Sequence, residues 1–283
     1  MASTIAQAQT WSQAQGLDRL DAQLLVLHAL GRADMERAWL LAHDTDTLPD
    51  TAHATLQAYV RRRAAGEPLA YITGLKAFYG LELLVDARVL VPRPDTETLV
   101  DWALELLVHQ PRNTRVLDLG TGSGAIALAL KHTRPDLEIS AVDFSEDALY
   151  VAQANARRLR LDVQFVKGNW LGAAQGRFSL IVSNPPYIAD ADHHLTALTH
   201  EPLQALTSGA DGLDDIRTII TQAPAHVMSG GWLLLEHGYD QAPAVRALLT
   251  QAGFADAQSR CDLAGIERCS GAWLPHTLAS AKV

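Results

Sequence analysis

The stretch VLDLGTGSGAIALAL, residues 116–130, constrains the fold more than any other part of the chain. A short apolar run typical of a buried strand leads into a turn containing Gly120, Gly122 and Gly124, and an apolar helical pattern follows. Glycine tolerates the positive φ angles of such a turn and lets a ligand approach the backbone closely. The stretch therefore predicts a strand–turn–helix unit with a ligand-binding turn at the carboxyl end of its strand.

Strand-like and helix-like segments alternate along the rest of the chain. This alternation is typical of βαβ units, and it predicts an α/β fold with a Rossmann-like, mainly parallel sheet covered by helices on both faces. Two further extended segments, 256–262 and 266–274, are expected to complete the sheet. The predicted strands are 115–119, 138–143, 162–167, 178–183 and 231–236, and the predicted helices are 124–132, 146–158, 214–228 and 241–252.

The first 75 residues have a different pattern, which predicts a small helical domain. Leucines recur at helical spacing from Leu17 to Leu30, and Gly31 follows as a C-cap. Further helices are predicted over Met35–His43 and over Asp50–Ala65, with Asp50 as N-cap of the latter. Three parts follow from these patterns: helical residues 1–75, a hairpin or extended connector over 76–92, and an α/β domain over 93–283 that begins with a helix over 98–109.

The composition limits the function classes. The chain carries 23 Lys and Arg against 32 Asp and Glu, a net charge of −9, which argues against a basic surface for duplex DNA or anionic membrane. No apolar run approaches the roughly 20 residues of a membrane span, and the N-terminus lacks the features of a secretory signal. Cys261 and Cys269, the only two cysteines, cannot form a disulfide framework. We expect a cytoplasmic protein that binds neither DNA nor membrane.

Two kinds of ligand are compatible with the glycine turn. Gly120, Gly122 and Ala125 fit the G-x-G-x-x-A pattern of dinucleotide sites, and Asp143 ends the next strand, where NAD and S-adenosylmethionine would both place a ribose. Asp118, two residues before the first glycine, would repel the pyrophosphate of a dinucleotide, whereas an acidic rim suits the ammonium and sulfonium of S-adenosylmethionine. These residues favour S-adenosylmethionine, although the glycine motif alone does not decide.

The tetrad Asn184-Pro185-Pro186-Tyr187 follows the predicted strand 178–183, so it lies at the same edge of the sheet as the glycine turn. Its two prolines remove backbone donors and stiffen the loop, which leaves carbonyls as the available polar groups. The Asn184 side-chain oxygen and the Pro185 carbonyl can each accept one N–H of a planar NH₂ group. The Tyr187 ring can stack on that plane, and its hydroxyl has no assigned role. The tetrad therefore predicts a receptor for an amide or amine.

Together these motifs resemble those of a known family. Asp118-Leu-Gly-Thr-Gly-Ser-Gly124 with Asn184-Pro-Pro-Tyr187 resembles the class I amino-methyltransferases. The closer resemblance is to the bacterial protein-(glutamine-N5) methyltransferases of the PrmC/HemK type, which modify peptide chain release factors. It covers nearly the whole chain and includes four further segments: EPLAYITG at 67–74, VPRPDTE at 91–97, EPLQAL at 201–206 and GGWLLLEHG at 230–238.

The resemblance implies a role for each motif. S-adenosylmethionine, leaving as S-adenosylhomocysteine, would lie against the glycine turn and Asn184, with Asp143 on its ribose and Trp170 near its adenine. Asn169 departs from the family, which usually has an acid there, so an adenine contact would lack charge assistance. The turn comprises Gly120, Thr121, Gly122, Ser123 and Gly124. The glutamine of a Gly-Gly-Gln segment in a class-1 release factor would be held by Asn184, Pro185, Pro186 and Tyr187, with Asn184, Pro185 and Tyr187 catalytic.

The expected reaction is direct in-line methyl transfer, with no covalent enzyme intermediate and no metal. An amide nitrogen is a poor nucleophile because its lone pair is shared with the carbonyl. Two acceptors that grip both N–H bonds would orient this nitrogen and raise its electron density, so positioning and electrostatics would supply the catalysis. Residues 1–75 would recognise the release factor, and we expect a monomer.

Other sites and functions are disfavoured. A nucleic-acid amino-methyltransferase is the main alternative, because the tetrad also suits an exocyclic base amine. Residues 1–111, however, hold nine Lys and Arg against fourteen Asp and Glu, a poor phosphate clamp. An inert cofactor-binding module would show a damaged motif, and both motifs are intact. Asp190, Asp192, His193 and His194 could suggest a metal, but methyl transfer from a sulfonium needs no Lewis acid, and this loop more simply flanks the substrate. Arg61–Arg63 are expected to be a solvated helix end, and Trp102 and Trp232 to pack in the core. Glu236 and His237 are equally compatible with structural and catalytic roles.

Overall fold

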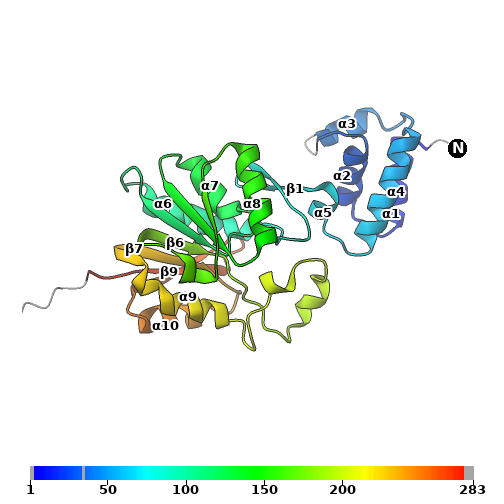
Figure 1. Cartoon of the computed structure of the whole chain (residues 1–283). Helices are drawn as coiled ribbons and strands as arrows, with labels where there is room; N and C mark the ends of the chain where they lie inside the picture. The colour runs from blue at the N-terminus through cyan, green and yellow to red at the C-terminus, as the bar shows by residue number, and fades with distance from the viewer. Residues whose placement is uncertain (1–2, 34–35, 277–283) are drawn as a thin grey trace, which may run out of the picture. The chain divides into compact units, whose positions relative to one another are not determined.

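The computed structural model describes residues 3–33 and 36–276. It divides into two compact units, Met1–Leu75 and Lys76–Val283, each with its own hydrophobic core (Figure 1). Within the described residues, no helix has both the length and the apolar character needed to cross a lipid bilayer.

The first unit is helical. Thr4 and Gln7 form a capping box at the start of α1, and Gly31, with a φ of 68°, follows the end of α2 as predicted. Apolar faces of these helices share one core that includes Leu25, Leu40 and Leu56. The α-helices in the described residues of this unit are α1 (Ile5–Ala14), α2 (Arg19–Ala29), α3 (Arg37–Ala42), α4 (Asp50–Ala64) and α5 (Leu69–Thr73).

Two details of this unit differ from the prediction, and one lies outside the described residues. Pro49 is the N-cap of α4 and Asp50 is its first helical residue, where the carboxylate still favours the positive end of the helix dipole. At the end of this helix Arg61 and Arg62 are exposed as predicted, whereas Arg63 is partly buried and pairs with Asp21. Met35, the predicted start of the second segment, lies outside the described residues.

The second unit begins with a hairpin, as one of the two predicted forms of the connector. Strands β1 (Leu75–Phe78) and β2 (Leu81–Leu84) pair through a two-residue turn. Both turn residues, Tyr79 and Gly80, have positive φ angles of 47° and 73°, as a type I′ turn requires. Helix α6 (Glu97–Leu107) follows the short 3-10 turn η2 (Pro94–Thr96).

A seven-stranded sheet forms the centre of this unit, in the order β5-β4-β3-β6-β7-β9-β8. The first five strands in that order are parallel, and β9 and β8 add an antiparallel edge, which confirms the predicted α/β class. The sheet strands are β3 (Arg115–Leu119), β4 (Glu138–Asp143), β5 (Gln164–Lys167), β6 (Phe178–Ser183), β7 (Val227–Glu236), β8 (Ala255–Cys261) and β9 (Glu267–Trp273).

Helices cover both faces of the sheet (Figure 1). One face packs against α6, α7 (Ala125–Thr133) and α8 (Glu146–Leu159), and the other against α9 (Asp214–Gln222) and α10 (Ala242–Gln251). Trp102 of α6 is 1% exposed and meets Trp232 edge-on, with ring centroids 6.2 Å apart, so both tryptophans pack in the core as predicted. This arrangement leaves the carboxyl ends of the parallel strands available for a site.

The predicted helix over 214–228 is wrong at its end. Helix α9 stops at Gln222, the 3-10 turn η6 (Ala223–Ala225) follows, and β7 already begins at Val227. Pro224 lacks the N–H that would continue the helix, and Val227 pairs with Phe178 in the sheet. Tertiary pairing therefore recruits four more residues into β7 than the hydrophobic pattern predicts.

Candidate active site

A cavity of about 320 Å³ lies at the carboxyl edge of the parallel strands, a volume typical of small-molecule sites. Its lining residues all fall between Arg88 and Asp215, so the second unit forms it. Of the predicted site residues, Gly124, Pro185 and Tyr187 do not line the cavity in the described part of the chain. The predicted site residues that line it are Gly120, Thr121, Gly122, Ser123, Asp143, Trp170, Asn184 and Pro186.

The glycines of the turn are explained by its backbone conformation. Gly120, Gly122 and Gly124 all have positive φ, at 68°, 55° and 84°, which strains any other residue. A Cβ on Gly122 would also meet no atom within 4 Å, so this glycine leaves open space beside the cavity. A Cβ on Gly120 would instead lie 3.2 Å from the Trp170 ring. The turn therefore forms a hollow with an indole at its side.

Asp118 does not lie where the sequence places it. Its side chain is 0% exposed beneath the turn, where Oδ2 accepts hydrogen bonds from the Thr121 hydroxyl and the Ala127 amide. Burial raises the pKa of this carboxyl to about 7. Asp118 therefore shapes the turn from below instead of facing the ligand, so direct repulsion of a pyrophosphate is the wrong reason to exclude a dinucleotide.

Asp143 supplies a better reason. Its two carboxylate oxygens accept hydrogen bonds from the amides of Gly122 and Ser145, at 2.8 and 2.9 Å. Asp143 also lines the cavity, and burial raises its pKa despite these bonds. The Gly122 amide, which could otherwise bind a phosphate, thus already donates to the Asp143 carboxylate. The edge of the cavity at Asp143 remains acidic. This environment suits a cationic ligand more than a pyrophosphate.

Trp170 reaches the cavity through an unusual backbone. Its φ is 47°, and its indole N–H donates a 3.0 Å hydrogen bond to Asp215 Oδ1 at the start of α9. The other oxygen of Asp215 accepts the Ser208 hydroxyl. Asn169 is exposed, and it lines the same cavity as Trp170 and Asp215. The sequence pattern contained no signal that Asp215 would hold the indole.

Asn184 follows β6, and its amide nitrogen donates a 3.2 Å hydrogen bond to the Thr96 hydroxyl. Pro185 is buried and Pro186 is partly exposed in the cavity wall. Tyr187 packs its ring against the core under α9 and α10, and its hydroxyl donates a 3.2 Å hydrogen bond to Glu236 Oε1. The Tyr187 hydroxyl, to which the sequence analysis gave no role, therefore belongs to the hydrogen-bond network at the site.

Glu236 is the last residue of β7 and is 2% exposed. Burial raises the pKa of this carboxyl to about 7, whereas the nearby Thr96 hydroxyl and the Tyr187 hydroxyl lower it. Oε2 has no hydrogen-bond partner among the described residues. His237, next along the chain, bonds to Ser270 and to the Gly238 carbonyl, which is a structural role. The structure thus distinguishes Glu236, which contacts the tetrad, from His237, which bonds elsewhere, although the sequence left both roles open for each.

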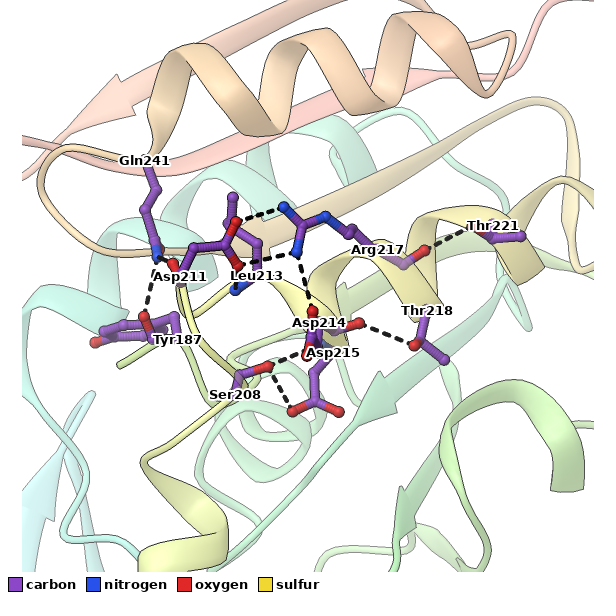
Figure 2. A network of polar contacts seen from close by, with 10 residues as sticks. All are labelled: Tyr187, Ser208, Asp211, Leu213, Asp214, Asp215, Arg217, Thr218, Thr221 and Gln241. Carbon is purple, nitrogen blue, oxygen red and sulfur yellow. Dashed lines mark hydrogen bonds and ion pairs between the residues drawn. The ribbon is translucent and has the colours of Figure 1, made fainter. Parts of the chain in front are cut away.

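A polar network holds the backbone after the tetrad (Figure 2). The Gln241 side chain donates hydrogen bonds to the carbonyls of Tyr187 and Asp211, at 3.0 and 3.2 Å. Gly212 passes so close that an added Cβ would lie 2.2 Å from the Tyr187 carbonyl oxygen. Arg217 pairs with Asp211 in the same network. Gln241 and Gly212 are therefore supports of the tetrad that sequence motifs do not indicate.

The loop between Ile188 and Thr207 closes on itself and borders the cavity. Ile188 and Thr207 form a parallel β-bridge. Glu201 is 7% exposed; its carboxylate accepts a hydrogen bond from the Val91 amide and forms an ion pair with Arg93. These contacts anchor the segment whose Pro202, Gln204 and Ala205 line the cavity. In the same loop, Asp192, His193 and His194 bring three potential ligand atoms within 4.8 Å of one another.

Comparison with known proteins is consistent with this geometry. A family model described as the PrmC N-terminal domain matches residues 6–74, and one described as the methyltransferase small domain matches residues 96–211. A release factor glutamine methyltransferase of Bordetella pertussis is 50% identical over 263 residues, 92% of this chain and 96% of that protein. The chain belongs to the release factor glutamine methyltransferase family. This confirms the resemblance and the methyltransferase fold.

Other relatives support the same membership of the release factor glutamine methyltransferase family. The protein of that name from Xylella fastidiosa is 49% identical over 256 residues, 89% of this chain and 92% of its own length. Among solved structures, a methyltransferase from Pyrococcus furiosus superposes with a TM-score of 0.54 at 18% identity, over 78% of this chain and 98% of its own. That likeness shows the fold alone.

Proposed function

We propose that this protein transfers a methyl group from S-adenosylmethionine to the side-chain amide nitrogen of the glutamine in the Gly-Gly-Gln segment of a class-1 peptide chain release factor. The observation that carries the proposal is the placement of Asn184 in the wall of the same cavity as the glycine turn. A substrate amide at Asn184 would thus lie beside a ligand held at that turn. A release factor substrate would place the enzyme in the cytoplasm.

The cavity suits the cofactor on three counts. The hollow at Gly122 admits a ligand close to the backbone. The acidic Asp143 offers oxygens for ribose hydroxyls, and the Trp170 indole offers an apolar surface for a purine. The Gly122 amide already donates to Asp143, and this disfavours binding of the phosphates of a dinucleotide at the turn. When bound, S-adenosylmethionine supplies a methyl group made electrophilic by its sulfonium.

The tetrad suits a planar amide. The nitrogen of the Asn184 side chain is engaged by Thr96, so its oxygen is the end left to accept a substrate N–H. The carbonyl of Pro185 would accept the second N–H. These two acceptors would aim the amide nitrogen along the line of transfer and increase its electron density. The nitrogen gains the methyl carbon as the sulfur–carbon bond breaks, and its extra proton then leaves to water.

The first unit is proposed to recognise the release factor. The residues that line the cavity belong to the second unit and begin at Arg88. The first unit has its own core, and the family model that matches it is distinct from the one that matches the methyltransferase region. A separate recognition unit would explain how an enzyme with a small amide site selects one glutamine in a folded protein.

The proposal is tested with purified release factor and S-adenosylmethionine labelled in its methyl group. Label should enter the release factor, and fragmentation by mass spectrometry should place it on the glutamine side chain of Gly-Gly-Gln. A release factor with that glutamine replaced by alanine is the matched control and should stay unlabelled. Label that enters ribosomal RNA or DNA instead would support the nucleic-acid alternative and overturn the proposal.

A further inference from the structure

We propose that Thr96 and Glu236 are positioning residues that fix which end of the Asn184 side-chain amide faces the substrate. The inference rests on the proposed function, in which the Asn184 oxygen accepts a substrate N–H. It concerns two residues that do not belong to the tetrad, one at the end of η2 and one at the end of β7.

The fold brings these residues together at one edge of the sheet. Strands β6 and β7 are parallel neighbours, and their register pairs Ser183 with Leu235. Asn184 and Glu236 are therefore the next residues along two adjacent strands. Thr96 is 3% exposed, and its hydroxyl accepts the Asn184 amide at 3.2 Å. The same hydroxyl lies close enough to the Glu236 carboxyl to lower its pKa, and the buried Oε2 of that carboxyl has no hydrogen-bond partner among the described residues.

The direction of these bonds follows from the chemistry of each group. An ionised carboxylate only accepts, and a hydroxyl has a single hydrogen to donate. If Thr96 gives its hydrogen to Glu236, its oxygen is left to accept, and only the NH₂ end of Asn184 can donate to it. A reversed amide would set two oxygens against each other. The Asn184 oxygen is therefore directed away from Thr96 and remains available for the substrate.

Glu236 also engages the last residue of the tetrad, through the hydroxyl of Tyr187 at 3.2 Å. In the proposed arrangement, one buried carboxylate connects the two ends of the tetrad, directly at Tyr187 and through Thr96 at Asn184. Such a network is worth more when complete than its separate bonds indicate, because each bond orients the next. It gives a reason for burying an acid here, where an apolar residue would cost less to bury.

The test removes the Thr96 hydroxyl and measures chemistry separately from binding. Thr96→Val should lower the single-turnover rate of glutamine methylation about tenfold or more, while the Kd for S-adenosylmethionine changes less than about twofold. Thr96→Ser, which keeps the hydroxyl, should restore most of the rate. The matched control is Thr114→Val: Thr114 is also buried, at 6% exposed, but its hydroxyl bonds only to the Pro111 carbonyl, before β3.

A double variant shows whether Thr96 acts through Asn184. Thr96→Val added to Asn184→Ala should cause no further loss of rate, because the amide that Thr96 orients is already gone. Glu236→Gln gives a second route to the same answer. Its NH₂ group can donate to Thr96, so the threonine hydrogen can turn to the Asn184 oxygen, and the rate should fall in a folded protein.

Two kinds of failure are distinguishable. A wild-type enzyme that leaves the Gly-Gly-Gln glutamine unmethylated overturns the proposed function and this inference with it. A wild-type enzyme that methylates it, with Thr96→Val equally fast, overturns the inference alone. Independent and additive losses from Thr96→Val and Asn184→Ala would overturn it as well, since they would mean that Thr96 does not work through Asn184.

Discussion

The hydroxyl of Tyr187 donates a hydrogen bond to Oε1 of Glu236 at 3.2 Å, inside the core next to the candidate site. The bond joins the last residue of the tetrad to the end of the neighbouring strand. Burial and the nearby carboxylate together raise the pKa of the Tyr187 phenol, so this group acts as a donor throughout the ordinary pH range. Loss of the Tyr187 hydroxyl would therefore remove one of the few hydrogen bonds that the Glu236 carboxylate accepts.

Tyr187→Phe should consequently be more harmful than loss of an exposed hydroxyl. Tyr187 lowers the pKa of Glu236 through its hydrogen bond, so the variant should raise that pKa and move the pH profile of the rate toward higher pH. The pH dependence of single-turnover methylation checks this. Tyr79→Phe is the matched control, because the Tyr79 hydroxyl also donates to a carboxylate, that of Asp101, away from the cavity. An unshifted profile for Tyr187→Phe would contradict the expectation.

The rate of methylation should rise with pH through about 7. Burial raises the pKa of Glu236 to about 7. In the proposed arrangement only the ionised form accepts the Thr96 hydrogen. The charged neighbours act in opposite directions, with Asp95 raising this pKa and Arg268 lowering it. Glu236→Gln should flatten the rise, as measured by single-turnover rates from pH 5.5 to 9. A wild-type profile that is level across this range would contradict it.

The same burial affects stability with the opposite trend. The folded chain binds more protons than the unfolded chain between about pH 4.5 and pH 7, because the folded pKa of Glu236 is the higher one. The free energy of unfolding should therefore fall as the pH rises through this window. Glu236→Gln should reduce the slope without abolishing it, since Asp118 has a pKa raised to about 7 as well. Urea unfolding at several pH values measures the slope.

Asn184→Ala should lower the single-turnover rate about a hundredfold or more, with little change in the free energy of unfolding. The Asn184 side chain is partly exposed in the cavity wall and donates a hydrogen bond to Thr96, so the stability of the fold depends on it weakly. Asn184→Asp keeps an acceptor but adds a charge beside the sulfonium, so it should retain some activity while altering cofactor affinity. An alanine variant as fast as wild type would remove the tetrad from the chemistry.

Asp143→Ala should weaken S-adenosylmethionine binding about tenfold to a hundredfold. Charge-assisted hydrogen bonds to the ribose are worth about 1.5–3 kcal/mol, and the variant also releases the amides of Gly122 and Ser145. Calorimetry without release factor measures the change. Asp147→Ala, an exposed acid in the first turn of α8, is the control and should bind normally. Tight NAD binding by the wild type, with no S-adenosylmethionine binding, would reverse the cofactor assignment.

Removal of residues 1–75 should separate recognition from cofactor binding. The remaining unit keeps every residue that lines the cavity, so its affinity for S-adenosylmethionine should stay within a few-fold of the full chain. Methylation of a folded release factor should drop at least tenfold if the first unit supplies the docking contacts. Circular dichroism establishes that the shortened chain is folded. Lost cofactor binding in a folded α/β unit would argue against the proposed division.

Local patterns in the sequence were sufficient for most of the fold. Strands β3, β4 and β6 begin and end where predicted, because each is a short apolar run bounded by turn residues. The end of α9 was missed because Val227 joins β7 only through pairing with Phe178, a partner far away in the sequence. The same limit applies to Asp118, whose position beneath the turn depends on how α7 packs over it.

The sequence by itself determined the fold class, the glycine turn and the tetrad, because these depend on residues within one or two turns of each other. Only the tertiary structure decided which side chains support them. Glu236 lies near Thr96 because β7 ends beside η2, and Asp215 holds Trp170 because α9 starts beside the 3-10 turn η3 (Trp170–Ala173). Such partners are dozens of residues or more apart along the chain. Their contacts arise from the packing of whole strands and helices, which no local pattern encodes.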